Sequence, residues 1–197
     1  MFRRLAVVVA CALALALALP RAADAASRTY RDSTGDVWAL DSPEDGRHTR
    51  APERRHGDIV RTTFQHRQRQ VLIRTRFAEL GRQHGRYVVA VRLRTDGHLV
   101  RWVRLSAGPG ENTWRGRTQT FQRDNSTPVD CATTHRVDYT DNTVVVRVPR
   151  ICLGQPRWVQ GTQGVAAFCG RQVFTDNPVD DGPTAHLRGY SPRIRRG

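Results

Sequence analysis

The chain of 197 residues contains no lysine, so all 32 of its basic residues are arginine. Methionine occurs once, and aromatic residues make up only 7% of the chain. With 39% hydrophobic and 25% charged residues, the composition excludes a collagen-like or wholly disordered protein. The length suits one domain and excludes two large ones. Arginine without lysine indicates a GC-rich bacterial coding sequence, but codon bias does not explain the net charge of +14, which is an excess of bases over acids.

Long apolar runs are absent after the first 26 residues, so the sequence predicts no membrane span beyond them. A short basic segment, 1–4, precedes an apolar run over 5–19, which is shorter than the roughly 20 residues of a spanning helix. Pro20 ends this run, and Ala23-Asp24-Ala25 has the small-x-small pattern of a signal-peptidase site. The sequence therefore predicts a signal peptide over 1–26 and a secreted, extracellular protein that can associate with the cell envelope.

Short segments rich in β-branched and aromatic residues follow, separated by turn-forming clusters and with little helical periodicity. The pattern predicts strands over 28–31, 37–40, 58–66, 70–78, 87–94, 99–105, 114–122, 131–139, 143–148 and 165–168. Within 70–78, Val71, Ile73 and Phe77 share one face and Arg74 and Arg76 the other. We expect an all-β, immunoglobulin-like antiparallel sandwich of about nine or ten strands over 27–190. Residues 42–57 read as a surface loop and 191–197 as a basic disordered tail.

Three cysteines follow the predicted cleavage site, in an exported protein where disulfides persist. Asp141-Asn142 favours a two-residue turn, which places Thr140 opposite Thr143. Cys131 then faces Cys152 within disulfide distance. The same register pairs Val137 with Val146, Tyr139 with Val144 and Arg136 with Arg147. The sequence thus predicts a Cys131–Cys152 disulfide.

Cys169 is left over. It is read as a buried free thiol, with an intermolecular bridge or a re-paired disulfide as the alternatives. No histidine motif accompanies it, so a catalytic cysteine is not expected.

Three sequence motifs follow one another along the chain in an order that resembles that of a known family. Residues 32–36 read DSTGD, residues 57–60 read GDIV before the strand around 71–73, and residues 144–149 with Leu153-Gly154 lead to strands around Trp158 and Val165. This order resembles the DOMON-like β-sandwiches, which include family 9 carbohydrate-binding modules and C-terminal domains of glucodextranase type. It is similar to small exported actinobacterial proteins of that kind.

The resemblance implies an immunoglobulin-like sandwich that binds sugars, in some members haem, and in several a structural calcium. By position it implies Asp32, Asp36 and Asp58 as calcium ligands, a set that Asp180 and Asp181 would complete if the fold brings them near. Carboxylates in loops suit a hard cation. The alternative is that these aspartates cap turns. The sequence locates no aromatic sugar-stacking platform and no axial haem ligand.

No hydrolase, nucleotide-binding or zinc-protease motif is present. The seven histidines show no metal-ligand spacing: His135 is expected in the core, and His56 lies beside the implied calcium loop. Glu79 and Glu111 would have to meet to act as a glycosidase pair, and nothing in the sequence indicates that they do. A non-catalytic protein is therefore expected.

Arginines alternate with core residues in several predicted strands and are expected on a solvent-facing sheet surface: Arg74, Arg76, Arg92, Arg94, Arg115 and Arg117. Such a surface would bind acidic polymers, and its alternative is a merely solvated face. Trp102 and Trp114 are candidate stacking groups if exposed. The expected function is a non-catalytic binding module at the cell envelope for carbohydrate or an anionic cell-wall polymer, without sequence-specific nucleic-acid binding. The alternatives are a secreted hydrolase with a loop-borne site and a structural or protein-interaction domain.

Overall fold

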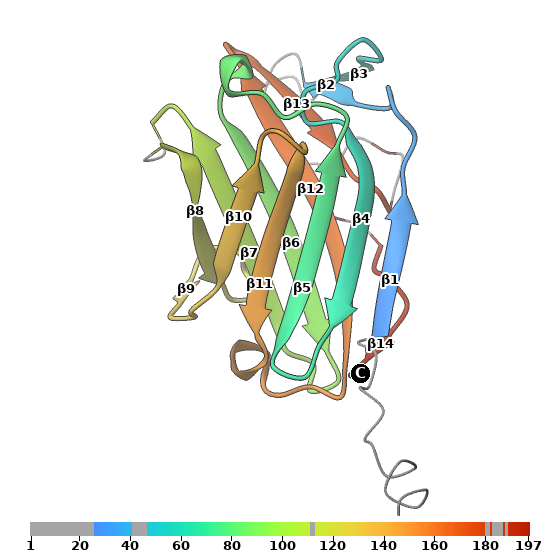
Figure 1. Ribbon diagram of the computed structural model, residues 1–197, viewed down its shortest axis with the longest axis vertical. Helices are drawn as coiled ribbons and strands as arrows, with labels where there is room; N and C mark the ends of the chain where they lie inside the picture. Colours follow the sequence, from blue (N-terminus) through green and yellow to red (C-terminus); the bar gives the residue numbers. More distant parts are fainter. Residues whose placement is uncertain (1–25, 41–46, 111–112, 180–181, 183–186, 188) are drawn as a thin grey trace, which may run out of the picture.

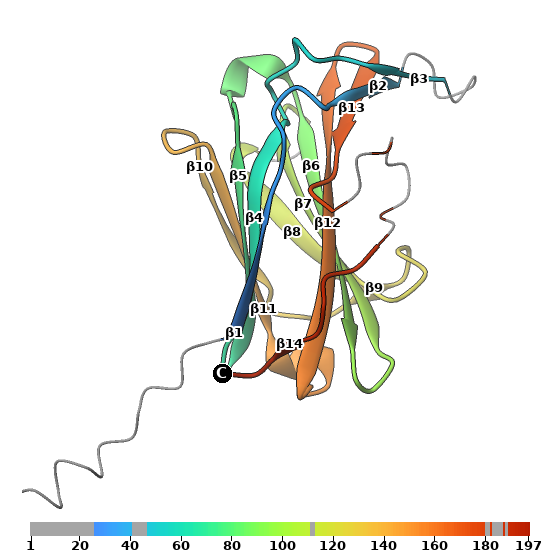
Figure 2. The same ribbon diagram turned by 90° about the vertical axis from the view of Figure 1, so that its right-hand side faces the viewer.

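The computed structural model describes residues 26–40, 47–110, 113–179, 182, 187 and 189–197. They form two antiparallel sheets packed face to face, which confirms the predicted all-β sandwich (Figures 1 and 2). Residues 1–25, most of the predicted signal peptide, lie outside the described residues, as do Glu111, Asp180 and Asp181. In the described part of the chain, no helix has the length and apolar character needed to cross a membrane.

The first sheet has five strands and faces the viewer in Figure 1. Its strands, in spatial order, are β1 (Ala26–Arg31), β4 (Ile59–His66), β5 (Gln70–Phe77), β11 (Thr143–Pro149) and β10 (Thr134–Asp138). The second sheet has nine strands. They are β3 (His48–Arg50), β2 (Trp38–Leu40), β13 (Gln172–Asp176), β12 (Trp158–Cys169), β6 (Tyr87–Thr95), β7 (Val100–Gly108), β8 (Thr113–Phe121) and β9 (Pro128–Val129), with β14 (Ile194–Arg195) pairing with β12. Two short 3-10 turns, η1 (Arg82–His84) and η2 (Arg150–Leu153), join strands.

The core lies between the sheets and follows the alternation read from the sequence. On β5, Val71, Ile73 and Phe77 are buried, whereas Arg74 and Arg76 are exposed. Packing between the layers is tight where β12 crosses β4. A Cβ at Gly161 would lie 2.4 Å from a ring carbon of Phe64, so glycine is what lets this ring fill the core.

The structure has more strands than were predicted, because four strands were not expected from the sequence: β3, β9, β13 and β14. Three of these have only two or three residues, too few for alternation to show. The predicted loop over 42–57 contains β3, and its residues 42–46 lie outside the described part. β12 also starts earlier than expected, at Trp158, because its glycines interrupt the apolar pattern.

The prediction of a disordered tail over 191–197 is wrong. Ile194 is buried in the core, and β14 pairs with the start of β12. The Nδ1 of His66 lies 3.1 Å from the Ile194 carbonyl, and the Gly197 N–H donates to the His66 carbonyl at 3.2 Å. One apolar residue and an available strand edge therefore order a segment whose composition is mostly basic.

The predicted register of the β10–β11 hairpin is also wrong. Asp138 pairs with Thr143, so the connection has four residues, Val137 pairs with Val144, and Arg136 pairs with Val145. The Asp138 carboxylate accepts hydrogen bonds from the N–H groups of two turn residues, Thr140 and Asp141, which stabilises the wider turn. Arg136 therefore does not face Arg147, which pairs with Thr134.

The disulfide prediction is confirmed despite the different register. Cys131 and Cys152 form a disulfide with a Cα–Cα distance of 5.8 Å. Cys131 precedes β10 and Cys152 lies in η2, so the bridge closes the hairpin just outside its ladder. Cys169 is a free, half-buried cysteine at the end of β12.

Candidate functional site

The six arginines expected on one surface lie on two opposite sides of the sandwich. Arg74 and Arg76 are on the outer face of the five-stranded sheet. The other four are on the outer face of the nine-stranded sheet: Arg92 and Arg94 on β6, and Arg115 and Arg117 on β8. The six therefore do not form one continuous surface.

The five-stranded sheet instead gathers arginines that the sequence did not single out. In one row across three strands, Arg31 pairs with Arg61 and Arg61 with Arg76. Neighbouring strands lie about 4.8 Å apart, so these three side chains leave the sheet side by side. We call the arginine face the outward set Arg31, Arg61, Arg74, Arg76 and Arg147.

The charges of the arginine face are not neutralised by ion pairs in the described structure, although Asp138 and Asp141 lie beside it. None of its five guanidinium groups forms an ion pair within the part of the chain that the structure describes. The ion pair on this side of the sheet joins Arg136 to Asp138, at 2.8 Å. Like charges directly opposite each other destabilise a sheet, so the row holds a repulsion that a bound anion would relieve.

A hollow of about 390 Å³ lies where the arginine face meets the turn between β10 and β11. The backbone of this turn lies in the upper part of Figure 1. We call this hollow the corner hollow. Its lining comprises Arg61, Thr63, Arg74, Arg76, Thr140, Asp141, Asn142 and Thr143. A smaller hollow of about 120 Å³ shares Arg74, Asp141 and Thr143 with it and continues over β11 toward Arg147.

The aromatic residues of the other sheet are largely covered by guanidinium groups. The ring of Trp102 lies under Arg92, at 5.3 Å, and its indole N–H donates to the Arg123 carbonyl at 3.2 Å. Trp158 lies under Arg193, at 4.6 Å. Trp114 points between the sheets and contacts Tyr139 edge to face. Trp102 and Trp114, the two expected stacking groups, thus lie apart and do not form one platform.

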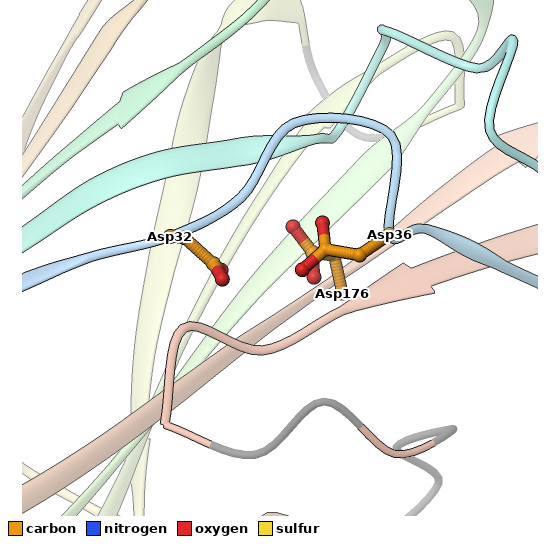
Figure 3. A group of neighbouring side chains, drawn as sticks. All are labelled: Asp32, Asp36 and Asp176. Carbon is orange, nitrogen blue, oxygen red and sulfur yellow. The ribbon is translucent and has the colours of Figure 1, made fainter.

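A cluster of carboxylates lies at the junction between the two sheets. The chain crosses from β1 to β2 through residues 32–37, and this crossover packs beside the end of β13. Asp32, Asp36 and Asp176 each place a carboxylate oxygen within 4.8 Å of the others (Figure 3). The implied ligands Asp32 and Asp36 are therefore together, and Asp176 joins them in place of Asp58.

Asp58 lies beside this cluster and supports its loop. One of its oxygens accepts a hydrogen bond from the Gly35 N–H at 2.9 Å. Gly35 has a φ of 81°, which suits glycine, and a Cβ there would lie 3.1 Å from the Pro52 carbonyl oxygen. The other Asp58 oxygen is buried without a hydrogen-bond partner among the described residues. Turn capping, the alternative role of these aspartates, thus uses only part of their hydrogen-bonding capacity.

Burial and mutual repulsion raise the pKa values of two carboxyl groups of the cluster, Asp32 and Asp176. Burial, followed by the charges of Asp176 and Asp36, raises the pKa of Asp32 to about 8. Burial also raises the pKa of Asp176 to about 7, against the hydrogen bond that it accepts from the Ile59 N–H. The carboxyl groups of Asp32 and Asp176 therefore hold protons near neutral pH unless a cation compensates their charge.

The donor set fits a hard divalent cation such as Ca²⁺. Calcium takes carboxylate oxygens at roughly 2.3–2.6 Å, so two ligands of one ion lie within about 5 Å of each other. Asp32 Oδ2, Asp36 Oδ1 and Asp58 Oδ1 are buried and lack hydrogen-bond partners in the described residues. An ion here would link the β1–β2 crossover to β13, which is a structural role.

The histidines and glutamates considered from the sequence form other contacts. Both ring nitrogens of His135 are bonded, Nδ1 to the Thr118 hydroxyl and Nε2 to the Arg115 carbonyl, so it bridges the two sheets. His56 is buried and packs on His84, with ring centroids 4.9 Å apart, rather than on the carboxylates. Glu79 pairs with His84 at 2.6 Å.

Comparison with known proteins adds no family to these observations, since no family model and no curated protein matches the chain. The resemblance to DOMON-like sandwiches and the calcium set that it implies stay predictions.

Proposed function

We propose that the protein is an exported, non-catalytic binding module that holds an anionic polymer of the cell envelope on its arginine face. The observation that carries this proposal is the row Arg31–Arg61–Arg76, in which three strands present guanidinium groups side by side. A linear polyanion laid across the strands would contact these groups in succession. Guanidinium groups bind carboxylate, sulfate and phosphate through paired hydrogen bonds.

Contrast with the other sheet supports the choice of face. There, Arg92 and Arg104 contact the rings of Trp102 and Phe121, so part of their binding capacity is used within the fold. The side chains of the arginine face have no such contacts among the described residues. Export agrees with the disulfide, because such bridges persist outside the reducing cytosol.

In this proposal, calcium would have a structural role. Asp32, Asp36 and Asp176, with Asp58 beside them, would hold the ion, which would neutralise their charge and fix the crossover between the sheets. Asp32 directly follows Arg31 of the arginine face, but the carboxylates of the cluster lie at the junction between the sheets, so calcium would affect stability more than polymer binding.

The test compares two variants that lose the same charge from opposite sheets. The first is Arg61→Gln/Arg74→Gln/Arg76→Gln, and its matched control is Arg94→Gln/Arg115→Gln/Arg117→Gln. Retention on an immobilised polyanion is measured against salt concentration. Loss of three phosphate-type contacts reduces the slope of log K against log salt by up to about 3 in the first variant. Equal losses in both variants would show that net charge alone drives binding and would overturn the proposal.

A further inference from the structure

We infer that the corner hollow binds an acidic sugar unit, a uronate residue of an anionic polysaccharide, and not the phosphates of a polyphosphate or nucleic acid. This inference rests on the proposed function and names the ligand class of the same face. Its basis is the mixture of groups that line the hollow.

The hollow offers cations on one side. Arg61 and Arg76 pair across neighbouring strands, and Arg74 lies two residues before Arg76 on β5. A carboxylate on a sugar ring would sit between these guanidinium groups and accept bidentate hydrogen bonds.

The hollow also contains a carboxylate, which a site that binds only anionic groups would not be expected to contain. Asp141 lines it, and its carboxylate forms no side-chain hydrogen bond or ion pair in the described structure. The backbone of Asp141 is held in place, because its N–H donates to Asp138 and its carbonyl accepts from the Thr143 hydroxyl. A carboxylate repels any anionic group, that of a uronate included, but it accepts hydrogen bonds from sugar hydroxyls, which polyphosphate lacks. A ligand that carries both an acid group and hydroxyls, as a uronate does, matches both sides of the hollow.

Fixed polar groups complete the lining. The Asn142 amide oxygen accepts the Leu80 N–H, which leaves its NH₂ group as a donor. Thr63 shares a hydrogen bond with Thr29, which holds its hydroxyl in place. The volume of about 390 Å³ lies at the small end of the range for ligand pockets and suits one or two sugar rings.

The surroundings disfavour nucleic acid and favour an extended sugar chain. Each described aromatic residue in the strands of this sheet points inward, namely Tyr30, Phe64 and Phe77, so the face has nothing on which bases would stack. The smaller hollow shares Arg74 and Asp141 with the corner hollow and adds Arg147, beside the Arg136–Asp138 ion pair. A second sugar unit would therefore meet one further arginine of the arginine face.

The experiment measures the affinity of the full protein for three probes at one ionic strength: hexagalacturonate, its methyl ester and linear polyphosphate. Asp141→Ala is the test variant. Asp130→Ala is the control, because Asp130 is an exposed carboxylate that lines neither hollow. We expect the wild-type protein to bind hexagalacturonate at least about tenfold more tightly than the ester, since charged hydrogen bonds are lost. Asp141→Ala should weaken hexagalacturonate binding about tenfold and leave polyphosphate binding equal or stronger.

The outcomes separate this inference from the proposed function. Retained polyphosphate binding shows that the Asp141→Ala variant is folded. If Asp141→Ala strengthens binding of both anions equally, the hollow is an electrostatic surface only, and the inference fails while the proposed function stands. If the wild-type protein binds neither anion, both fail.

Discussion

Replacing both Cys131 and Cys152 with alanine should lower the free energy of unfolding by about 3 kcal/mol. The two cysteines are 21 residues apart in sequence, and closing a loop of that length removes about 11 cal/mol/K of entropy from the unfolded chain. The folded state should change little, because η2 has other anchors. The guanidinium group of Arg150 donates to the carbonyls of Gln68 and Pro156, at 2.9 and 2.7 Å.

Thermal or urea unfolding checks this magnitude. For a domain of this size, 3 kcal/mol corresponds to a fall in Tm of roughly 6–12 °C. Cys169→Ala is the control, and its effect should stay within about 1 kcal/mol because it removes no cross-link. A loss below about 1 kcal/mol in the double variant, or equal losses in variant and control, would refute the reasoning.

Three further predictions concern the cluster, the core and the chain end. With a chelator present, Tm should fall as pH rises from about 6.5 to 8, because Asp32 and Asp176 hold protons in the folded state that the unfolded chain has already released. Burial lowers the pKa values of His56 and His66, and these two groups raise stability with pH only below about 6.5, so they do not oppose this trend. Calcium should raise Tm and flatten this slope, and a rising Tm in chelator would contradict the raised pKa values. Gly161→Ala should cost about 1–3 kcal/mol in urea unfolding, because its Cβ would overlap the Phe64 ring, whereas Gly97→Ala, where space is open, should not. Deleting residues 192–197 should cost at least about 2 kcal/mol by removing buried Ile194 from the core, and an unchanged unfolding midpoint would mean that the end contributes nothing to the fold.

Alternation of apolar and polar residues was sufficient to predict the long strands, because one face of each strand must be buried. It also placed Arg74 and Arg76 outward correctly. It could not show that Arg31 and Arg61 stand beside Arg76, since only the pairing of β1, β4 and β5 creates that row. Two-residue strands such as β14 depend on an available sheet edge, which local sequence does not reveal.

The carboxylate cluster could likewise be predicted only in part from the sequence. Asp32 and Asp36 share a short loop, so their proximity was predictable from sequence spacing. Asp176 is distant in sequence and reaches them because β13 pairs with β2, directly after that loop. The hairpin register failed for a different reason: Asp138 caps a four-residue turn, and Asn142 is held by hydrogen bonds to the end of β5 and to Leu80.

Co-sedimentation with isolated bacterial cell walls at low and high salt tests the central claim most directly. We expect the wild-type protein and the Arg94/Arg115/Arg117 glutamine variant to sediment with the walls at low salt and to be released at high salt. The Arg61/Arg74/Arg76 glutamine variant should stay in the supernatant at both concentrations. Equal sedimentation of the two variants would contradict binding by the arginine face.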